Sequence, residues 1–264
     1  MPALPRARKR FGQHFLTDRH YVERIVQAIA PARDDSMVEI GPGTGILTEQ
    51  LIAHLAHLHA VEIDRDLAAQ LRTQFPAAKL TVHGEDALEF DFDSLAAPLR
   101  VVGNLPYNVS TPILFRMAAI ADRVRDCVFM LQKEVVERMV AKPDTPEYGR
   151  LSVMLQYRFA MAIAVRVPPG AFTPPPKVDS AVVRMAPLGA DRVRARDEAL
   201  FGRIVGAAFE QRRKMLRGAL RSLAKPQVFE AAGIDSARRG ETLSVAQFVA
   251  LADAAVASPI RPAG

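Results

Sequence analysis

The sequence contains a single cysteine and no apolar run long enough to cross a membrane. Cys127, in the run DCVFML, has no partner for an intrachain disulfide, and we expect it to be a buried small hydrophobic residue. No run approaches the roughly 18 apolar residues of a membrane span. The N-terminal stretch MPALPRARKRFGQHFL is basic but lacks an apolar run with a cleavage site, so we expect no signal peptide. These absences favour a cytoplasmic protein without a membrane partner.

Basic charge is concentrated in two segments. Between Arg192 and Lys225 there are ten Lys and Arg residues against three acidic ones, a surplus larger than the net +6 of the whole chain. Residues 6–10 add four basic side chains with no acid among them. Such clustering indicates a polyanionic partner, most simply a nucleic acid. A solvated helix face is the alternative reading.

The first 190 residues alternate short apolar runs with helical patterns. This alternation predicts an α/β fold with a parallel sheet covered by helices. The linker between the last two strands is rich in proline, which predicts a stiff extended path and an antiparallel pair at the edge of the sheet. The seven expected strands are 37–40, 58–63, 79–83, 99–103, 127–131, 162–168 and 181–187, and the expected helices include 44–55, 64–75, 133–141 and 148–157.

The character of the chain changes near residues 189–191. Beyond this point no strand pattern remains, and four short helices are expected at 198–209, 212–223, 227–232 and 245–255. We therefore place one domain at 1–189 and a small, basic, all-helical domain at 190–264. Arg213, Arg217 and Arg221 recur every four residues and are expected to share a helix face that follows a phosphate backbone.

A glycine turn lies at the junction of the first strand and its helix. In VEIGPGTGILTEQL, Gly41, Gly43 and Gly45 permit tight turning and close approach of a ligand to the backbone. The spacing G-x-G-x-G differs from the dinucleotide fingerprint G-x-G-x-x-G. The turn contains no lysine, which argues against a P-loop for nucleoside triphosphates.

Carboxylates follow the second and third strands. Glu62 is placed to accept hydrogen bonds from ribose hydroxyls, and Asp86 from an adenine amino group. Together with the glycine turn they indicate an adenosine ligand across the edge of the sheet. Each feature also has a purely structural reading, since a glycine turn needs no ligand and Asp86 can cap a helix.

The fourth strand ends in GNLPY, which places Asn104, Leu105, Pro106 and Tyr107 at the expected position of the reacting group. No Ser/His/Asp arrangement and no metal cluster is evident nearby, so the chemistry needs little acid–base help. Methyl transfer from a sulfonium donor to an adenine amino group fits, because Asn104 can accept from the amine while Tyr107 offers a flat face to an unstacked base. The alternative is a purely structural role, with the Asn in a turn and the Tyr in the core. His54, His57 and His59 are expected to point apart, so we expect no metal site there.

These motifs together resemble those of the bacterial 16S rRNA dimethyladenosine transferase family, known through kasugamycin sensitivity. The resemblance is carried, over nearly the full length, by KRFGQHFL, VEIGPGTG, VVGNLPYNVSTPIL, FMLQKEVVERM, YGRLSVMLQY, AFTPPPKVDSAVVRM and FEQRRKMLRGAL. It implies a Rossmann-like methyltransferase sheet of seven strands with S-adenosylmethionine as donor and no metal. It also implies N6,N6-dimethylation of two adjacent adenines in the 3′-terminal hairpin of 16S rRNA, within the immature small subunit.

The resemblance also implies roles for single residues. Residues 1–18 form a basic arm that contributes His14 and Leu16 to the cofactor site, through either the His14 ring or its backbone. Phe172 faces Tyr107 across the target base. The implied cofactor-binding set is His14, Leu16, Gly41, Gly43, Glu62, Asp86 and Asn104, and the implied catalytic set is Asn104, Leu105, Pro106, Tyr107 and Phe172.

Three other functions are compatible with parts of the sequence. A 23S rRNA adenine dimethylase of the macrolide-resistance type shares the chemistry and differs in substrate. A non-catalytic RNA-binding assembly factor is disfavoured by the intact set of site residues. A nicotinamide oxidoreductase is disfavoured by the glycine spacing and by NLPY. No segment suggests a partner helix, so we expect a monomer.

Overall fold

The computed structural model describes residues 14–106 and 109–257. The basic residues 6–10 and Tyr107 therefore lie outside the described residues. The chain divides into two compact units, which we call the sheet unit, 1–136 with 159–187, and the helical unit, 137–158 with 188–264. Residues 137–158, which the sequence predicts within the first domain, thus belong with the C-terminal helices.

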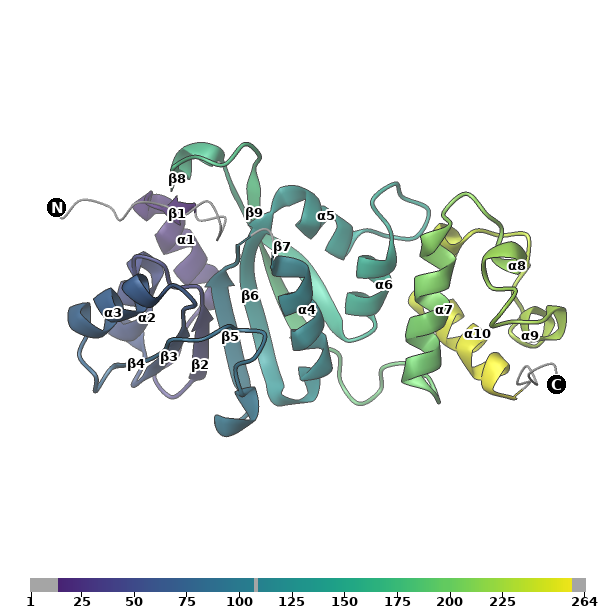
Figure 1. The fold of residues 1–264 in the computed structure, drawn as a ribbon, viewed down its shortest axis with the longest axis horizontal. Helices are drawn as coiled ribbons and strands as arrows, with labels where there is room; N and C mark the ends of the chain where they lie inside the picture. The colour runs from purple at the N-terminus through teal and green to yellow at the C-terminus, as the bar shows by residue number, and fades with distance from the viewer. Residues whose placement is uncertain (1–13, 107–108, 258–264) are drawn as a thin grey trace. The chain divides into compact units, whose positions relative to one another are not determined.

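A seven-stranded sheet forms the centre of the sheet unit (Figure 1). Its order is β4-β3-β2-β5-β6-β9-β7, with β2 to β6 mutually parallel and β9 antiparallel to both neighbours. The predicted fold class and the antiparallel pair at one edge are confirmed. The strands are β2 Ser36–Ile40, β3 Leu58–Val61, β4 Leu80–His83, β5 Leu99–Asn104, β6 Val124–Gln132, β7 Phe159–Val167 and β9 Ser180–Pro187.

Two helices of the sheet unit begin at an aspartate whose side chain caps them. Asp18 accepts from the N–H of His20 at the start of α1, and Asp64 accepts from the N–H of Asp66 at the start of α3. The helices of this unit are α1 Arg19–Ile29, α2 Ile46–His54, α3 Arg65–Gln74, α4 Ser110–Ala119 and the first half of α5 Lys133–Val140. The apolar faces of the first three form one buried cluster with strands of the sheet.

A second, two-stranded sheet joins the N-terminal arm to the proline-rich linker. Strand β1, Phe15–Leu16, pairs antiparallel with β8, Phe172–Thr173. The backbone N–H of Thr17 extends the contact by donating to the oxygen of Ala171 at 2.8 Å. The sequence predicts a stiff linker but no strand here, because two-residue strands carry no periodic pattern.

The helical unit has its own apolar core around Tyr148, Phe201 and Phe248, all of them at most 1% exposed. The hydroxyl of Tyr148 donates to the oxygen of Leu243 at 2.9 Å, which ties residues 137–158 to the C-terminal helices. Its helices are the second half of α5, α6 Arg150–Gln156, α7 Glu198–Glu210, α8 Leu216–Ala219, α9 Pro226–Ala231 and α10 Val245–Ala257.

The predicted helix 212–223 is wrong. Only the four residues of α8 are helical, because Met215 takes an extended conformation with ψ 152°. The N–H groups of Leu216 and Arg217 donate instead to the oxygens of Arg238 and Ser236, at 2.8 and 3.0 Å. Arg213 and Arg221 lie in turns on either side of α8, so they and Arg217 do not share one helix face.

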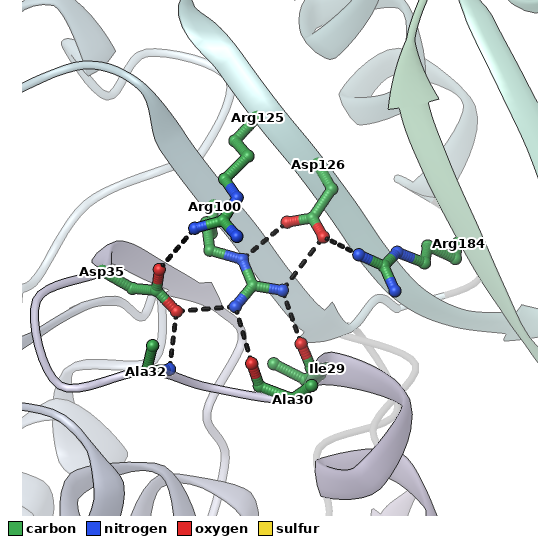
Figure 2. A network of polar contacts seen from close by, with 8 residues as sticks. All are labelled: Ile29, Ala30, Ala32, Asp35, Arg100, Arg125, Asp126 and Arg184. Carbon is green, nitrogen blue, oxygen red and sulfur yellow. Dashed lines mark hydrogen bonds and ion pairs between the residues drawn. The ribbon is translucent and has the colours of Figure 1, made fainter.

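A buried ion network fixes the end of the sheet opposite the carboxyl ends of the parallel strands (Figure 2). Arg100, at the start of β5, is paired with Asp35 at 2.6 Å and with Asp126 at 2.8 Å. The same guanidinium donates to the backbone oxygens of Ile29 and Ala30 at the end of α1. The exposed side chains of Arg125 and Arg184 complete the pairing of the two carboxylates.

Two other expectations concern the histidines and Cys127. The rings of His57 and His59 lie 5.1 Å apart, and His59 Nδ1 shares a hydrogen bond with His83 Nε2, so the expectation that they point apart is wrong. They meet because His57 directly precedes β3 and His59 lies within it, and both rings turn toward the neighbouring strand β4. Within residues 14–106 and 109–257, no group of three or more His, Cys, Asp or Glu could hold a metal ion. Cys127 is buried, as predicted.

No helix in the described part of the chain has the length and apolar character needed to span a membrane.

Candidate functional site

One pocket lies at the carboxyl ends of the parallel strands. Gly41 follows β2, Glu62 follows β3, Asp86 comes after β4, and Asn104 ends β5. All four line the pocket, where open α/β sheets bind ligands. The other predicted site residues that line it are His14, Leu16, Gly43, Leu105 and Pro106.

The strand ends meet closely because position 103 carries no side chain. Gly103 in β5 pairs with Ile40 in β2, and a Cβ at Gly103 would lie only 2.2 Å from the backbone oxygen of Ile40. The next residues, Asn104 and Gly41, are thereby held together, and a Cβ at Gly41 would lie 3.4 Å from the oxygen of Asn104. Gly41 and Gly43 have φ values of 67° and 60°, which glycine adopts at little cost.

Glu62 is anchored by the glycine turn. One carboxylate oxygen accepts from the N–H of Gly43 at 3.1 Å, and the other accepts from the N–H of Asp64 at 2.9 Å. Burial raises the pKa of Glu62, and the two backbone N–H groups oppose that rise. Each oxygen keeps a further lone pair for a ligand hydroxyl.

In both Asp86 and Asn104, one polar atom of the side chain is hydrogen-bonded to the protein's own backbone. One oxygen of Asp86 accepts from the N–H of Leu88 at 2.9 Å within a turn, not at the start of a helix, so the helix-capping interpretation is wrong and the other oxygen is left for a ligand. The Nδ2 of Asn104 donates to the backbone oxygen of His14 at 3.2 Å. This bond leaves the Oδ1 of Asn104 as an acceptor at the pocket.

The arm closes over the glycine turn. The ring of Phe15 packs on Gly43, since a Cβ there would lie 3.3 Å from it. His14 contributes its backbone oxygen to Asn104, whereas its ring Nδ1 donates to the oxygen of Pro174 at 2.8 Å. Leu16 is 4% exposed and lines the pocket. The arm therefore joins the cofactor side of the pocket to the proline-rich linker.

The two aromatic residues predicted to hold a base are not both placed at the pocket. Phe172 is 3% exposed, packs in the apolar cluster of the sheet unit and is absent from the pocket lining. Tyr107 lies outside the described residues. The predicted facing of these two rings stays a prediction.

One further residue of the site was not predicted from the sequence. Glu39 is 1% exposed and lines the pocket, and its Oε2 accepts from the hydroxyl of Thr48 at 2.6 Å. Burial raises the pKa of Glu39 to about 7, and the nearby charge of Glu62 adds to the rise. The available signal was a carboxylate inside the apolar strand MVEI, immediately before the glycine turn.

The pocket is acidic. Four carboxylates line it, from Glu39, Glu62, Glu85 and Asp86, and no Lys or Arg does so among the described residues. Such a lining favours a ligand with positive charge and with hydroxyl or amino donors. S-Adenosylmethionine has both, through its sulfonium and ammonium groups and its ribose and adenine donors, so the residues present fit this group.

Comparison with known proteins gives one consistent result. The family model described as "Ribosomal RNA adenine dimethylase" matches residues 5–256. A "Ribosomal RNA small subunit methyltransferase A" from Aromatoleum aromaticum is 59% identical over 246 residues, 93% of this chain and 93% of that protein. The protein of the same name from Bordetella pertussis is 57% identical over 252 residues, 96% of this chain and 95% of that one.

Solved structures show the same fold. A dimethyladenosine transferase from Plasmodium falciparum has a TM-score of 0.78 at 23% identity, covering 90% of this chain and 96% of that one. The 23S rRNA methyltransferase ErmE has a TM-score of 0.71 at 24% identity, covering 91% of this chain and 98% of that one. At these identities the likeness concerns the fold alone.

Proposed function

The chain belongs to the ribosomal RNA adenine dimethylase family, and from this premise we propose that it dimethylates N6 of two adjacent adenines in the 3′-terminal hairpin of 16S rRNA. The donor in such methyltransferases is S-adenosylmethionine, and the substrate is the immature small ribosomal subunit. The observation that carries the proposal is the free acceptor of Asn104, held at the end of β5 in the same pocket as the glycine turn.

The carboxyl ends of β2, β3 and β4 hold the cofactor. Gly41 and Gly43 receive its methionine part, Glu62 accepts from the ribose hydroxyls and Asp86 accepts from the adenine amino group. His14 and Leu16 cover it from the arm. When bound, the cofactor would supply a methyl group activated by its positively charged sulfonium sulfur. Loss of that methyl group leaves an uncharged thioether.

Asn104 orients the target amine. Its Oδ1 accepts an N–H of the adenine amino group, which turns the nitrogen lone pair toward the methyl and favours the positive charge that develops on the nitrogen. The N–H of Leu105 is already used, donating to the oxygen of Met130 at 3.1 Å. Pro106 has no N–H and fixes φ, so neither residue 105 nor residue 106 offers a free N–H here. Tyr107 offers its ring to the flipped base by stacking, and Phe172 can join it only when its buried ring turns out of the apolar cluster.

The helical unit contributes contacts to RNA phosphates. Arg213, Arg217 and Arg221 are all exposed. Although they do not share a helix face, they lie within nine residues of sequence around α8. We expect the protein to act as a monomer in the cytoplasm, where ribosomes assemble, and size-exclusion chromatography with light scattering tests its oligomeric state.

The test supplies methyl-labelled S-adenosylmethionine to the wild type and to Asn104→Ala, with unmethylated small subunits in one reaction and large-subunit RNA in a parallel one. Gln27→Ala, which removes an exposed amide from α1, is the matched control. We expect label as N6,N6-dimethyladenosine in 16S rRNA with the wild type and the control, and its loss with Asn104→Ala. Label in 23S rRNA instead would identify a dimethylase of the resistance type. Tight subunit binding with no label in any RNA would identify an assembly factor without catalysis.

A further inference from the structure

The pocket holds two buried carboxylates in different surroundings. Glu62 accepts from two backbone N–H groups and is 5% exposed. Glu39 is 1% exposed and has one donor, the Thr48 hydroxyl on α2, which reaches only its Oε2. Its second oxygen has no hydrogen-bond donor among the described residues. Because hydrogen bonds to the charged form favour ionisation, Glu62 is the better stabilised anion and Glu39 the worse.

The groups around Glu39 are themselves acidic or neutral. The negative charge of Glu62, directly after β3, raises the pKa of Glu39, and Glu85 and Asp86 after β4 line the same pocket. His14 in the arm is the remaining titratable residue of the lining, and no Lys or Arg of the described chain lines it. An anion at Glu39 is therefore costly until a cation enters. Burial raises the pKa of Glu39 to about 7, in agreement with this geometry.

We propose that Glu39 is a further cofactor-binding residue, which keeps its proton in the free protein, releases it to solvent when the positively charged donor binds, and thereby favours S-adenosylmethionine over the uncharged thioether product. The identity of the ligand rests on the proposed function. The physical basis is that donor and product differ by one positive charge on sulfur. A buried carboxylate in a site of low dielectric distinguishes that charge far better than an exposed one.

The role proposed for Glu39 is discrimination between donor and product, which is separate from the methyl-transfer step. Product and donor share the adenosine and the amino-acid part, so the contacts of Glu62 and Asp86 with that part serve both equally. A carboxylate that responds to the charge on sulfur binds the donor more tightly than the product. It therefore promotes replacement of product by new donor between successive methyl transfers. Thr48 acts as a positioning residue, since its hydroxyl fixes the Glu39 carboxylate and supports its ionised form.

Isothermal titration calorimetry of the full chain with S-adenosylmethionine and with S-adenosylhomocysteine tests this directly. Titrations at pH 6.0, 6.5 and 7.0, each in two buffers of different ionisation enthalpy, give the number of protons released. This range lies below the ordinary pKa of an α-amino group, so the ligand's own amine contributes little. The variants are Glu39→Gln, which keeps the shape without the charge, and Glu49→Gln, which removes an exposed carboxylate from α2 as matched control.

We expect the wild type and Glu49→Gln to release more than roughly half a proton per donor bound at pH 6.5, and Glu39→Gln to release almost none. We also expect the preference for donor over product to fall roughly tenfold in Glu39→Gln. Thr48→Val keeps the carboxylate but removes its donor, so proton release should persist to higher pH than in the wild type. This last result separates a titrating role from a merely structural one.

Any one of four results overturns the inference. If Glu39→Gln releases as many protons as the wild type, or keeps the same preference for donor over product, Glu39 is not the charge-sensitive group. Binding of the donor without any proton release by the wild type overturns the role of Glu39 alone. Failure of the wild type to bind either compound overturns the proposed function as well.

Discussion

Asn104 and His14 are 90 positions apart, yet the Nδ2 of Asn104 donates to the backbone oxygen of His14 at 3.2 Å. This single bond has two effects. It fixes which end of the amide faces the pocket, because the donor end is occupied and the acceptor end is left for the substrate. It also fastens the arm to the end of β5, beside the ring of Phe15 that packs on Gly43.

We therefore predict that Asn104→Asp impairs the enzyme in two ways. A carboxylate has no N–H, so one of its oxygens would face the oxygen of His14 and repel it. We expect methyl transfer to fall by roughly 100-fold or more, as when an oriented polar group is removed from an active site. Hydrogen exchange of the amides at 15–18 should also accelerate.

Gln27→Glu makes the same amide-to-carboxyl change on the exposed face of α1 and is the control. Both rates should be unchanged in it. Full methyl transfer by Asn104→Asp would show that the bond to His14 does not orient the amide.

Gly103→Ala should distort the pocket by pushing β5 away from β2 where the two strands end. Its Cβ would lie 2.2 Å from the oxygen of Ile40, and this neighbour is backbone within the sheet, so it cannot move aside as a flexible side chain would. Overpacking of this kind costs typically about 1–3 kcal/mol. We expect a lower unfolding free energy in urea and weaker donor binding. Gly170→Ala, where a Cβ meets nothing within 4 Å, is the control and should be neutral in both measurements.

Glu39→Gln should change how stability depends on pH. Burial raises the pKa of Glu39 to about 7 in the folded protein, above the ordinary value of 4.5. The folded state therefore binds the proton more tightly than the unfolded state. The stability that this proton contributes is fully present below pH 4.5 and is lost as the pH rises through about 7. Gln has no proton to lose. We expect the free protein carrying Gln to gain up to roughly 3 kcal/mol relative to wild type at pH 8, and little at pH 5.

Thermal unfolding at both pH values measures this difference. Glu49→Gln, in which an exposed carboxylate is changed, should track the wild type at each pH. An equal shift at pH 5 and pH 8 in Glu39→Gln would exclude titration of Glu39 as the cause.

Arg100→Met should be far more destabilising than Arg125→Met. Arg100 is buried between Asp35 and Asp126, and its removal leaves buried carboxylates with fewer partners (Figure 2). We expect a loss of about 3–5 kcal/mol in denaturant unfolding. Arg125 pairs with Asp35 from an exposed position, with 59% of its side chain accessible, and should cost less than about 1 kcal/mol. Equal losses in the two variants would contradict this ranking.

The same network should confer acid sensitivity. Burial alone would raise the pKa of Asp35, but the N–H of Ala32 and the guanidinium groups of Arg100 and Arg125 lower it below the ordinary 3.8. A lowered pKa means stabilisation that is present above pH 3.8 and is lost as the pH falls below it. We expect part of this pH dependence to disappear in Arg100→Met, as measured by unfolding between pH 2.5 and pH 5.

Arg213→Ala, Arg217→Ala and Arg221→Ala should each weaken RNA binding without altering donor binding. Removing one arginine–phosphate interaction should reduce the slope of log affinity against log salt by roughly one. Arg203→Ala, an exposed arginine on α7, is the control. Filter binding of small-subunit RNA at several salt concentrations measures the slopes. If the control weakens binding as much as the three variants, RNA binding depends on general charge and not on the surface around α8.

The sheet unit was largely predictable from sequence because its signals are local. Seven apolar runs gave seven strands, and four site residues lie where parallel strands end, as the rule for ligand binding in such sheets requires. The segment around α8 was not predictable in this way. Arg213, Arg217 and Arg221 have helical spacing, but the backbone of Leu216 and Arg217 bonds to the distant residues Arg238 and Ser236. Tertiary hydrogen bonds thus overrode a local pattern.

The sequence by itself determined the sheet, the glycine turn and the identity of the groups at four strand ends, since these depend on periodicity, turn chemistry and the resemblance of motifs. Only the tertiary structure decided how those groups are used. It assigned the ring of His14 to Pro174 and its backbone to Asn104, and buried Glu39 beside Glu62. The direction of an amide and the ionisation of a carboxylate depend on neighbours that are remote in the chain, so no local pattern encodes them.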